Sequence, residues 1–481
     1  MIADERPGTW LVWTEEHPLE AEPDALFAHL YGADGAPAVW LDSASQAYGS
    51  GRYSLMGAPE GPRDHVLAFW AADGRLAVDG QPAGTGHDLW RLVGERLDRN
   101  PSEAPAGLPF AGGYVGAVGY GVKSVGARPR SDAPDAQLAH LSRFLVLDHL
   151  VSRLHVVATG PASDEAEARA WIERTVDRIA HVRPLPRPAA PVRAGAAATS
   201  VTRDRYLDDL AAVRAWLRAG DSYEACYTYS LRFASDEAPF DVYRRLRRTN
   251  PAPYASYLRL DGRDVLSCSP ERYLAVTSSG WAETKPIKGT ARREADPASD
   301  REAARALAAD PKTRSENLMI VDLLRNDLGR VCAPGTVTVP RLMAVESYAT
   351  VHQLVTSVRG RLLPRRAAAV HAAEALFPPG SMTGAPKRRT VELLDGLEAA
   401  ARGLYSGVIG AFSRCGAVDL AVVIRTAVVS DGLVEIGTGG AITIESDPES
   451  EADETVAKAT PLLQAFGRTH PFEARRGRAG A

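Results

Sequence analysis

The residues with the clearest chemical potential lie near the C-terminus, in the segment DPESEADETVAKA. Glu451, Glu454 and Lys458 are spaced i, i+3 and i+7, so a helix would project two carboxylates and one ammonium from one face. Earlier in the chain, Glu316 opens the segment ENLMIVDLLRND. If the two helices meet, their carboxylates suit magnesium, a hard cation that keeps several waters and also binds substrate oxygens. Taken alone, this spacing is more typical of a solvated helix face.

The helices that must position these carboxylates are recognised from apolar periodicity and capping residues. Thr202 can cap a helix that Gly220 is placed to end. The apolar residues expected to face a core from the helix that Glu316 opens are Leu318, Val321, Leu324 and Leu328. Helices are expected at 302–309, 315–328, 366–376, 387–397 and 449–466.

Strands are expected between these helices. The segment from Tyr223 to Phe233 alternates with period two, which predicts a half-buried strand. Further strands are expected at 265–276, 348–359 and 404–412, and a hairpin is expected to turn at Asp431-Gly432. Because strands and helices intermingle without strict β-α-β alternation, the fold class is expected to be α+β.

The composition excludes several classes of function. The chain is 45% hydrophobic and 24% charged, with a net charge of −4 and no long runs of one sign, so no nucleic-acid or polybasic membrane surface is expected. The N-terminal MIADERPGTW has no basic region followed by an apolar core, and no stretch approaches about 18 consecutive apolar residues. We therefore expect a cytoplasmic protein that binds neither nucleic acid nor membrane.

A compositional change divides the chain. Proline and alanine displace the apolar pattern in PLPRPAAPVRAGAAATS, residues 184–200, which indicates a linker or a long surface crossing. At 481 residues the chain is long enough for about two or three domains, and we favour two. The expected division is an N-terminal region at 1–185, a linker at 186–200 and a catalytic domain at 201–475.

Five segments carry a family resemblance when they are read in chain order: SPERYL, PIKGTARR, SENLMIVDLLRNDLGRV, FPPGSMTGAPKRR and SDPESEADET. Together they resemble the chorismate-utilising enzymes, which include anthranilate synthase component I, aminodeoxychorismate synthase component I, isochorismate synthase and salicylate synthase. WLDSAS, RYSLMG and GGYVGAVGYG in the N-terminal half resemble the same family more weakly. The resemblance implies large antiparallel sheets packed as a sandwich with flanking helices.

The resemblance also implies a magnesium site. Glu316 and Glu454 match the family's direct magnesium ligands, and Glu451 matches a supporting carboxylate. Lys458 matches a residue that holds a substrate carboxylate. Magnesium would neutralise the ring carboxylate of chorismate and fix its plane.

The rest of the substrate pocket is implied in the same way. Arg425 matches a residue that holds the enolpyruvyl carboxylate together with Tyr405, because a planar guanidinium can form paired hydrogen bonds. The other residues expected at the pocket are Gly439, Gly440 and Ala441, through their backbone amides, and His352 and Thr383, which match residues lining the ring.

Lys288 decides which reaction the resemblance implies. Anthranilate synthases usually have alanine where this chain has Lys288, whereas lysine resembles aminodeoxychorismate synthase, in which the amine adds at C2 and ammonia then attacks C4. Glu271 matches the general acid that protonates the departing hydroxyl. A charged ammonium cannot attack, so the pKa of Lys288 is expected to be lowered by desolvation or by nearby magnesium. Glu224 stands where isochorismate and salicylate synthases carry a lysine that activates water, so water attack is disfavoured.

The source of ammonia is expected to lie outside this chain. None of the four isolated cysteines lies in the glycine-rich nucleophile elbow of a glutaminase, so a separate glutamine amidotransferase subunit is expected. Two alternatives stay open: anthranilate synthase component I or another aminating chorismate enzyme, and a non-catalytic chorismate-binding regulatory subunit. Retention of Lys288, Glu271 and the three glutamates argues against the second.

Overall fold

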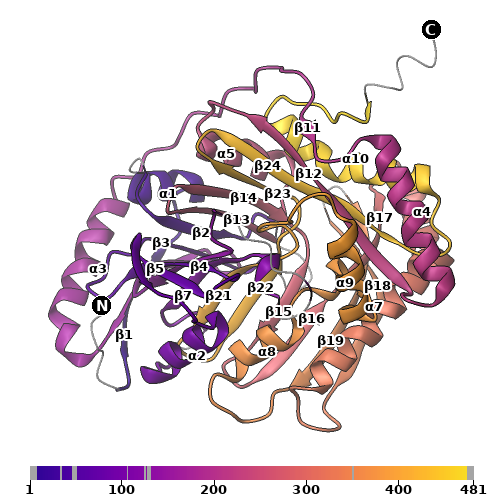
Figure 1. Ribbon diagram of the computed structural model, residues 1–481. Helices are drawn as coiled ribbons and strands as arrows, with labels where there is room; N and C mark the ends of the chain where they lie inside the picture. Colours follow the sequence, from indigo (N-terminus) through magenta and orange to yellow (C-terminus); the bar gives the residue numbers. More distant parts are fainter. Residues whose placement is uncertain are drawn as a thin grey trace.

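The computed structural model describes residues 8–32, 35–45, 51–105, 107–123, 126, 132–348 and 351–473. Within these ranges the chain forms two twelve-stranded sheets with helices around them (Figure 1). The pairings between the named strands are antiparallel. The predicted α+β class and the sandwich of large antiparallel sheets are therefore confirmed.

The first sheet combines strands from both halves of the chain. Its order is β1 (Leu11–Pro18), β10 (Arg153–Gly160), β9 (Arg143–Asp148), β3 (Tyr53–Gly57), β2 (Ala38–Asp42), β13 (Tyr254–Leu260), β14 (Arg263–Ser269), β23 (Thr426–Ser430), β24 (Leu433–Ile442), β12 (Glu224–Ala234) and β11 (Ala198–Thr199), with β20 (Gly384–Ala385) also paired to β12. The junction between the halves is the pairing of β2 with β13.

The second sheet also combines strands from both halves of the chain. Its order is β17 (Ile287–Arg292), β19 (Val351–Arg361), β16 (Trp281–Lys285), β15 (Arg272–Val276), β22 (Val418–Val422), β21 (Val408–Ser413), β7 (Gly113–Val118), β8 (Ala136–Leu141), β4 (His65–Trp70), β5 (Arg75–Val78) and β6 (Gln81–Gly84), with β18 (Thr338–Ser347) also paired to β19. Here the halves join where β7 pairs with β21.

Helices cover the outer faces of both sheets. They are α1 (Pro23–Tyr31), α2 (Leu89–Arg99), α3 (Glu165–Ile179), α4 (Arg203–Ala219), α5 (Pro239–Thr249), α6 (Pro297–Ala309), α7 (Pro311–Gly329), α8 (Ala368–Leu376), α9 (Lys387–Leu397) and α10 (Pro448–Ala465), with short 3₁₀ turns η1 (Tyr120–Val122), η2 (Ala162–Asp164) and η3 (Gly380–Met382). Apolar residues of α1, α4, α5 and α10 pack on the first sheet, and those of α2, α7 and α8 pack on the second. A third cluster, with Val39 and Val265 of the first sheet and Val115 and Ile409 of the second, lies between the sheets.

Local signals predicted several elements correctly. The Thr202 hydroxyl accepts a hydrogen bond from the backbone amide of Arg205, and Gly220 ends α4 with φ of 79°. The turn between β23 and β24 has Asp431 and Gly432 at φ of 49° and 72°, as an Asp-Gly hairpin turn requires. These features depend on neighbouring residues only, which is why the sequence reveals them.

Three predictions made from periodicity were wrong. The segment expected as one strand at 265–276 forms two, because β14 lies in the first sheet and β15 in the second. Leu318, which was expected to face the core, is 50% exposed. Ile320 lies in the core beside Val321 instead. The strand expected to be half-buried, β12, is buried on both faces from Glu224 to Leu231, because its polar face is covered by side chains that include Lys288 and Glu398.

The proline- and alanine-rich segment lies along the body of the protein. Residues 182–195 contain no helix or strand. Arg244 and Arg245 of α5 donate hydrogen bonds to the carbonyl oxygens of Pro186 and Ala189, at 2.6 and 3.0 Å. Both sheets draw strands from each side of this segment, so it connects two sets of strands that are hydrogen-bonded to each other.

Candidate active site

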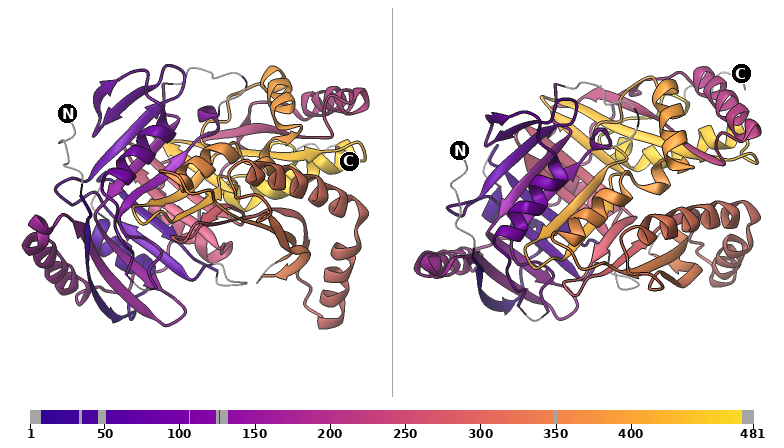
Figure 2. Two further views of the ribbon diagram at one scale, coloured as in Figure 1. Left: turned by 90° about the horizontal axis from the view of Figure 1, so that it is seen from below. Right: turned by 60° about the horizontal axis from the view of Figure 1, so that its bottom comes forward.

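The candidate site lies where the chain passes from one sheet to the other. Glu271 lies between β14 of the first sheet and β15 of the second, and Arg425 lies between β22 and β23, which are the neighbours of those strands. Lys288 is on β17 of the second sheet. Figure 2 shows α6, α7, β18 and β19 on one side of this region and α10 with β24 on the other. Side chains from both sheets therefore meet here.

Lys288 forms an ion pair with a residue of the opposite sheet. Its Nζ lies 2.5 Å from Oε1 of Glu224 on β12, and both side chains are buried. Burial by itself lowers the pKa of the ammonium, but the charges of Glu224 and Glu316 and the hydrogen bond to Glu224 outweigh it, so the pKa is raised well above its ordinary value. The predicted lowering of the Lys288 pKa is therefore wrong, because the sequence does not reveal the partner carboxylate.

Glu271 has the burial and the pKa expected of a general acid. It is 6% exposed. Burial raises its pKa to about 7, although a hydrogen bond from Ser381 and the charges of Lys288 and Lys458 act in the opposite direction. Such a carboxyl is substantially protonated near neutral pH and can donate a proton.

Two of the predicted metal carboxylates meet at one lysine. Nζ of Lys312, at the start of α7, lies 2.7 Å from Oε1 of Glu451 on α10 and 3.7 Å from Oε1 of Glu316 on α7. Burial raises the pKa of Glu316 to about 7, against the charges of Lys288 and Lys312. Carboxylates of the two helices are therefore brought to one lysine, whose ammonium lies between them.

The donor set suits magnesium in its chemistry. Among the described residues no three acidic, histidine or cysteine side chains form a metal-binding cluster. Magnesium, however, is commonly bound by one or two carboxylates together with waters and substrate oxygens. The predicted carboxylates, Glu316 and Glu454 with Glu451 in support, fit that requirement.

Glu454 and Lys458 lie beside this pair. Nζ of Lys458 is 2.8 Å from Oε1 of Glu454 and donates to the Gly439 carbonyl at 3.1 Å. The charge of Lys458, above all, lowers the pKa of Glu454. A Cβ on Gly440 would come within 3.2 Å of the Glu451 carboxylate and 4.0 Å of the Lys458 ammonium, so the glycine keeps that space free. Ala441 is next on β24, opposite Cys226.

Arg425 and Tyr405 lie near each other on the first-sheet side. The charges of Tyr405 and Glu454 act on the Arg425 guanidinium, whose pKa is lowered by burial. The Tyr405 ring packs on the backbone of Gly437, where a Cβ would lie only 2.1 Å from Cγ of the ring. The two predicted residues therefore lie within electrostatic reach of each other.

His352 and Thr383 make contacts within the protein. The ring nitrogens of His352 lie 2.7 Å from the Ser347 hydroxyl and 2.9 Å from a carboxylate oxygen of Asp300 on α6. The Thr383 hydroxyl donates to the Gly380 carbonyl at 3.1 Å, and its own carbonyl accepts from the amide of Cys226 on β12 at 2.9 Å. The His352 ring therefore pairs with two side chains, whereas Thr383 holds backbone groups of η3 and β12.

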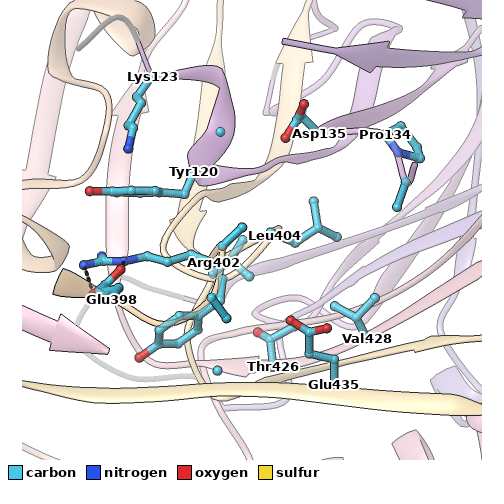
Figure 3. Close-up of a pocket in the computed structure, with 18 of the residues that line it drawn as sticks. Tyr120, Lys123, Pro134, Asp135, Glu398, Arg402, Leu404, Thr426, Val428 and Glu435 are labelled. Atoms are coloured by element: carbon cyan, nitrogen blue, oxygen red, sulfur yellow. Dashed lines mark hydrogen bonds and ion pairs between the residues drawn. The ribbon is translucent and has the colours of Figure 1, made fainter. Parts of the chain in front are cut away.

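A buried arginine, Arg402, holds backbone segments next to the candidate site. Arg402 forms a two-pronged ion pair with Glu398, at 2.7 and 2.8 Å, and donates to the carbonyl oxygens of Met382 and Cys226. Its guanidinium lies 4.4 Å from the centre of the Tyr120 ring. In Figure 3, Lys123 lies on the other side of that ring. These groups line a cavity of about 370 Å³ that also reaches Tyr405.

Two functional partners were not predicted as such. The sequence indicates no role for Glu224 beyond its standing in place of a lysine base, and it gives no reason to single out Lys312. The alternation of β12 places Glu224, Cys226 and Thr228 on one polar face, and this signal could have raised Glu224 as a site residue. No local pattern could have brought Lys312 to Glu451, since the two residues are 139 positions apart.

Comparison with known proteins gives the family. The sequence profile of the chorismate binding enzymes matches residues 39–464. Aminodeoxychorismate synthase of Streptomyces pristinaespiralis is 41% identical over 96% of this chain and 66% of its own length. Aminodeoxychorismate synthase component 1 of Salmonella typhimurium is 36% identical over 79% of this chain and 80% of its own. The chain thus spans just under two thirds of the length of the first of these relatives.

A solved structure agrees with this result. Anthranilate synthase component I from Streptococcus pneumoniae superposes with a TM-score of 0.73 and 26% sequence identity, covering 93% of this chain and 99% of that one. No helix in the described ranges is long and apolar enough to cross a membrane. The chain therefore belongs to the family of chorismate binding enzymes.

Proposed function

We propose that this protein aminates chorismate at ring carbon C4 and so acts as an aminodeoxychorismate synthase component I. The observation that carries the proposal is the buried amine of Lys288, which lies in reach of both sheets and faces Glu224. The printed names of the Streptomyces and Salmonella relatives support it.

Lys288 and Glu271 divide the chemistry. As a free amine, Lys288 adds to C2 of chorismate, the two conjugated ring double bonds shift, and the C4 hydroxyl departs as water with a proton from Glu271. Ammonia then adds to C4, the two double bonds shift back, and the bond between C2 and Lys288 breaks. Glu271 recovers its proton from the new amine, so the net change is chorismate plus ammonia to 4-amino-4-deoxychorismate plus water.

The remaining site residues hold the substrate. Arg425, with Tyr405, is proposed to bind the enolpyruvyl carboxylate through paired hydrogen bonds. Lys458 and the backbone amides of Gly439–Ala441 are proposed to bind the ring carboxylate of the substrate. Exclusion of water by the buried surroundings of Lys288 would protect the reaction from hydrolysis.

Magnesium is proposed as the cofactor. Glu316 and Glu454 would hold it from α7 and α10, with Glu451 as a supporting carboxylate. When bound, it would neutralise the ring carboxylate of chorismate and withdraw electron density from the ring. Lys312, which pairs with both Glu316 and Glu451, would have to release at least one of them.

Ammonia is proposed to come from a separate glutamine amidotransferase subunit. Cys226 and Cys268 lie inside strands, Cys332 follows α7, and Cys415 lies in the turn between β21 and β22. None is at a strand-to-helix turn, where a glutaminase nucleophile would be expected. We propose a cytoplasmic location for the complex.

A product assay tests the proposal against its nearest alternative, anthranilate formation. Purified protein with chorismate, magnesium and ammonium should consume chorismate without releasing pyruvate. Addition of a pyridoxal-phosphate-dependent lyase that eliminates pyruvate from the product should then yield 4-aminobenzoate. Release of anthranilate would contradict the proposal, and absence of any turnover would favour a non-catalytic subunit.

A further inference from the structure

Lys288 cannot act as a nucleophile while it holds its resting proton. In this protein its pKa is raised by the carboxylates around it, so the ammonium persists at neutral pH. The titratable groups whose charges interact with it are Glu224 and Cys226 of β12, Glu316 of α7, Glu454 of α10 and Glu271, which lies just before β15. One of these must take the proton if the proposed lysine addition is to occur.

Four of these groups are unsuited to that task. Burial raises the pKa of the Cys226 thiol, so it carries its own proton. Glu271 is proposed to supply a proton to the departing hydroxyl in the same step. Glu316 is paired with Lys312 and Glu454 with Lys458, and both glutamates are proposed magnesium ligands. Glu224 remains as the candidate proton acceptor, and its Oε1 already lies 2.5 Å from Nζ of Lys288.

Burial of the pair makes proton transfer feasible. Glu224 is 1% exposed, and its second oxygen, Oε2, has no hydrogen-bond partner among the described residues. An ion pair loses much of its advantage over the neutral pair where water is excluded and a carboxylate oxygen is left unpaired. Chorismate binding would exclude further water and shift the balance toward amine and carboxylic acid.

We propose that Glu224 is the general base that accepts the proton of Lys288, an inference that rests on the proposed function. The proton moves from Nζ to the Glu224 carboxylate, and the Nζ lone pair forms the bond to C2. When ammonia displaces the lysine, Lys288 leaves as a neutral amine and takes the proton back from Glu224. Glu224 is therefore unchanged over one turnover.

Glu224→Gln is the diagnostic substitution, because glutamine keeps the shape and can accept a hydrogen bond from Lys288 but cannot accept its proton, while the charge of Glu316 still favours the ammonium. Glu224→Asp keeps a base but shortens its reach. Cys226→Ser, on the same strand face, is the matched control. For each protein, the rate of chorismate amination with magnesium and ammonium would be measured from about pH 6 to pH 9. Intact-protein mass spectrometry without ammonium would measure formation of the Lys288 adduct.

We expect Glu224→Gln to lower the rate of amination about 100-fold at pH 7, with unchanged affinity for chorismate and slower adduct formation. The ratio of its rate to the wild-type rate should rise with pH, since solution base then replaces Glu224. Glu224→Asp should retain an intermediate rate, and Cys226→Ser should stay within about threefold of wild type.

The outcomes separate this inference from the function on which it rests. Glu224→Gln with a rate within threefold of wild type, or a rate ratio that does not change with pH, would overturn the base role while amination by the wild type stands. If Glu224→Gln does not fold, a Glu224→Asp rate equal to wild type at every pH would overturn it instead. A wild-type protein that neither aminates chorismate nor forms the adduct would overturn both.

Discussion

Glu271 is the residue whose protonation is easiest to follow. Because burial raises its pKa to about 7, the acid form that the reaction requires is lost as pH rises through that value. The rate of amination should therefore fall on the alkaline side. Replacing Glu271 by glutamine should remove this pH dependence and lower the rate by about 100-fold. A rate profile of both proteins between about pH 5.5 and 8.5 tests this.

Ser381 gives the matched control for Glu271. Its hydrogen bond lowers the Glu271 pKa, so Ser381→Ala should move the alkaline fall to higher pH while the maximal rate is retained. A fall that stays at the wild-type pH in Ser381→Ala, or that persists in Glu271→Gln, would mean that another group is responsible.

Lys312 is expected to compete with magnesium. Its ammonium lies between two carboxylates of the proposed metal site, so Lys312→Met should tighten magnesium binding by roughly tenfold, equivalent to about 1.4 kcal/mol. The same change should lower the melting temperature without magnesium, since Glu451 is then buried without its partner. Isothermal titration with magnesium measures the first effect and thermal unfolding the second.

Lys312→Arg, which keeps the charge, is the control for this experiment and should bind magnesium as the wild type does. Equal magnesium affinity in Lys312→Met and wild type would contradict competition at this site.

At the scale of single residues, the sequence indicated candidate catalytic side chains, but it did not indicate which residues those side chains contact. Lys288 and Glu271 lie in short motifs that can be read locally. The contact of Lys288 with Glu224 spans 64 positions and two sheets, and the pKa of Lys288 depends on that contact. This is why the direction of its pKa shift was predicted wrongly.

For helices and strands, too, local sequence signals predicted local structure but not long-range contacts. Caps and turns predicted α4 and the β23–β24 hairpin, because their causes lie within a few residues. Apolar periodicity could not show that the chain changes sheets between β14 and β15, since both strands read alike. That change of sheet is what places Glu271 at the candidate site.

Strand β24 provides a test of how an element positions the substrate pocket. A Cβ on Gly437 would overlap the Tyr405 ring, so Gly437→Ala must displace that ring. We expect the KM for chorismate to rise about tenfold and stability to fall by about 1–3 kcal/mol. Steady-state kinetics and denaturant unfolding measure the two effects.

Gly396, on α9, is the matched control because a Cβ there meets no atom within 4 Å. Gly396→Ala should leave KM unchanged and raise stability by about 0.5–1 kcal/mol, as alanine does within a helix. An unchanged KM in Gly437→Ala would show that Tyr405 does not act in substrate binding.

The whole molecule is built from sheets that neither half of the chain completes. Strand β13 needs β2, and β21 needs β7, so each half alone would expose unpaired edges and part of the core between the sheets. The sequence indicated a segment between two regions but gave no sign that their strands interleave.

Separated halves test this interdependence. Fragments 1–190 and 191–481 should each fail to unfold cooperatively, whereas a mixture refolded together should regain the circular dichroism and amination activity of the intact chain. A fragment 191–481 that folds cooperatively by itself would contradict this and would support two independent domains.

The position of the new nitrogen tests the central claim most directly. Chorismate incubated with the protein, magnesium and ¹⁵N-labelled ammonium would be examined by nuclear magnetic resonance. The proposed reaction predicts ¹⁵N bonded to C4 of a product that retains its enolpyruvyl group. Nitrogen bonded to C2, with or without loss of pyruvate, would contradict it.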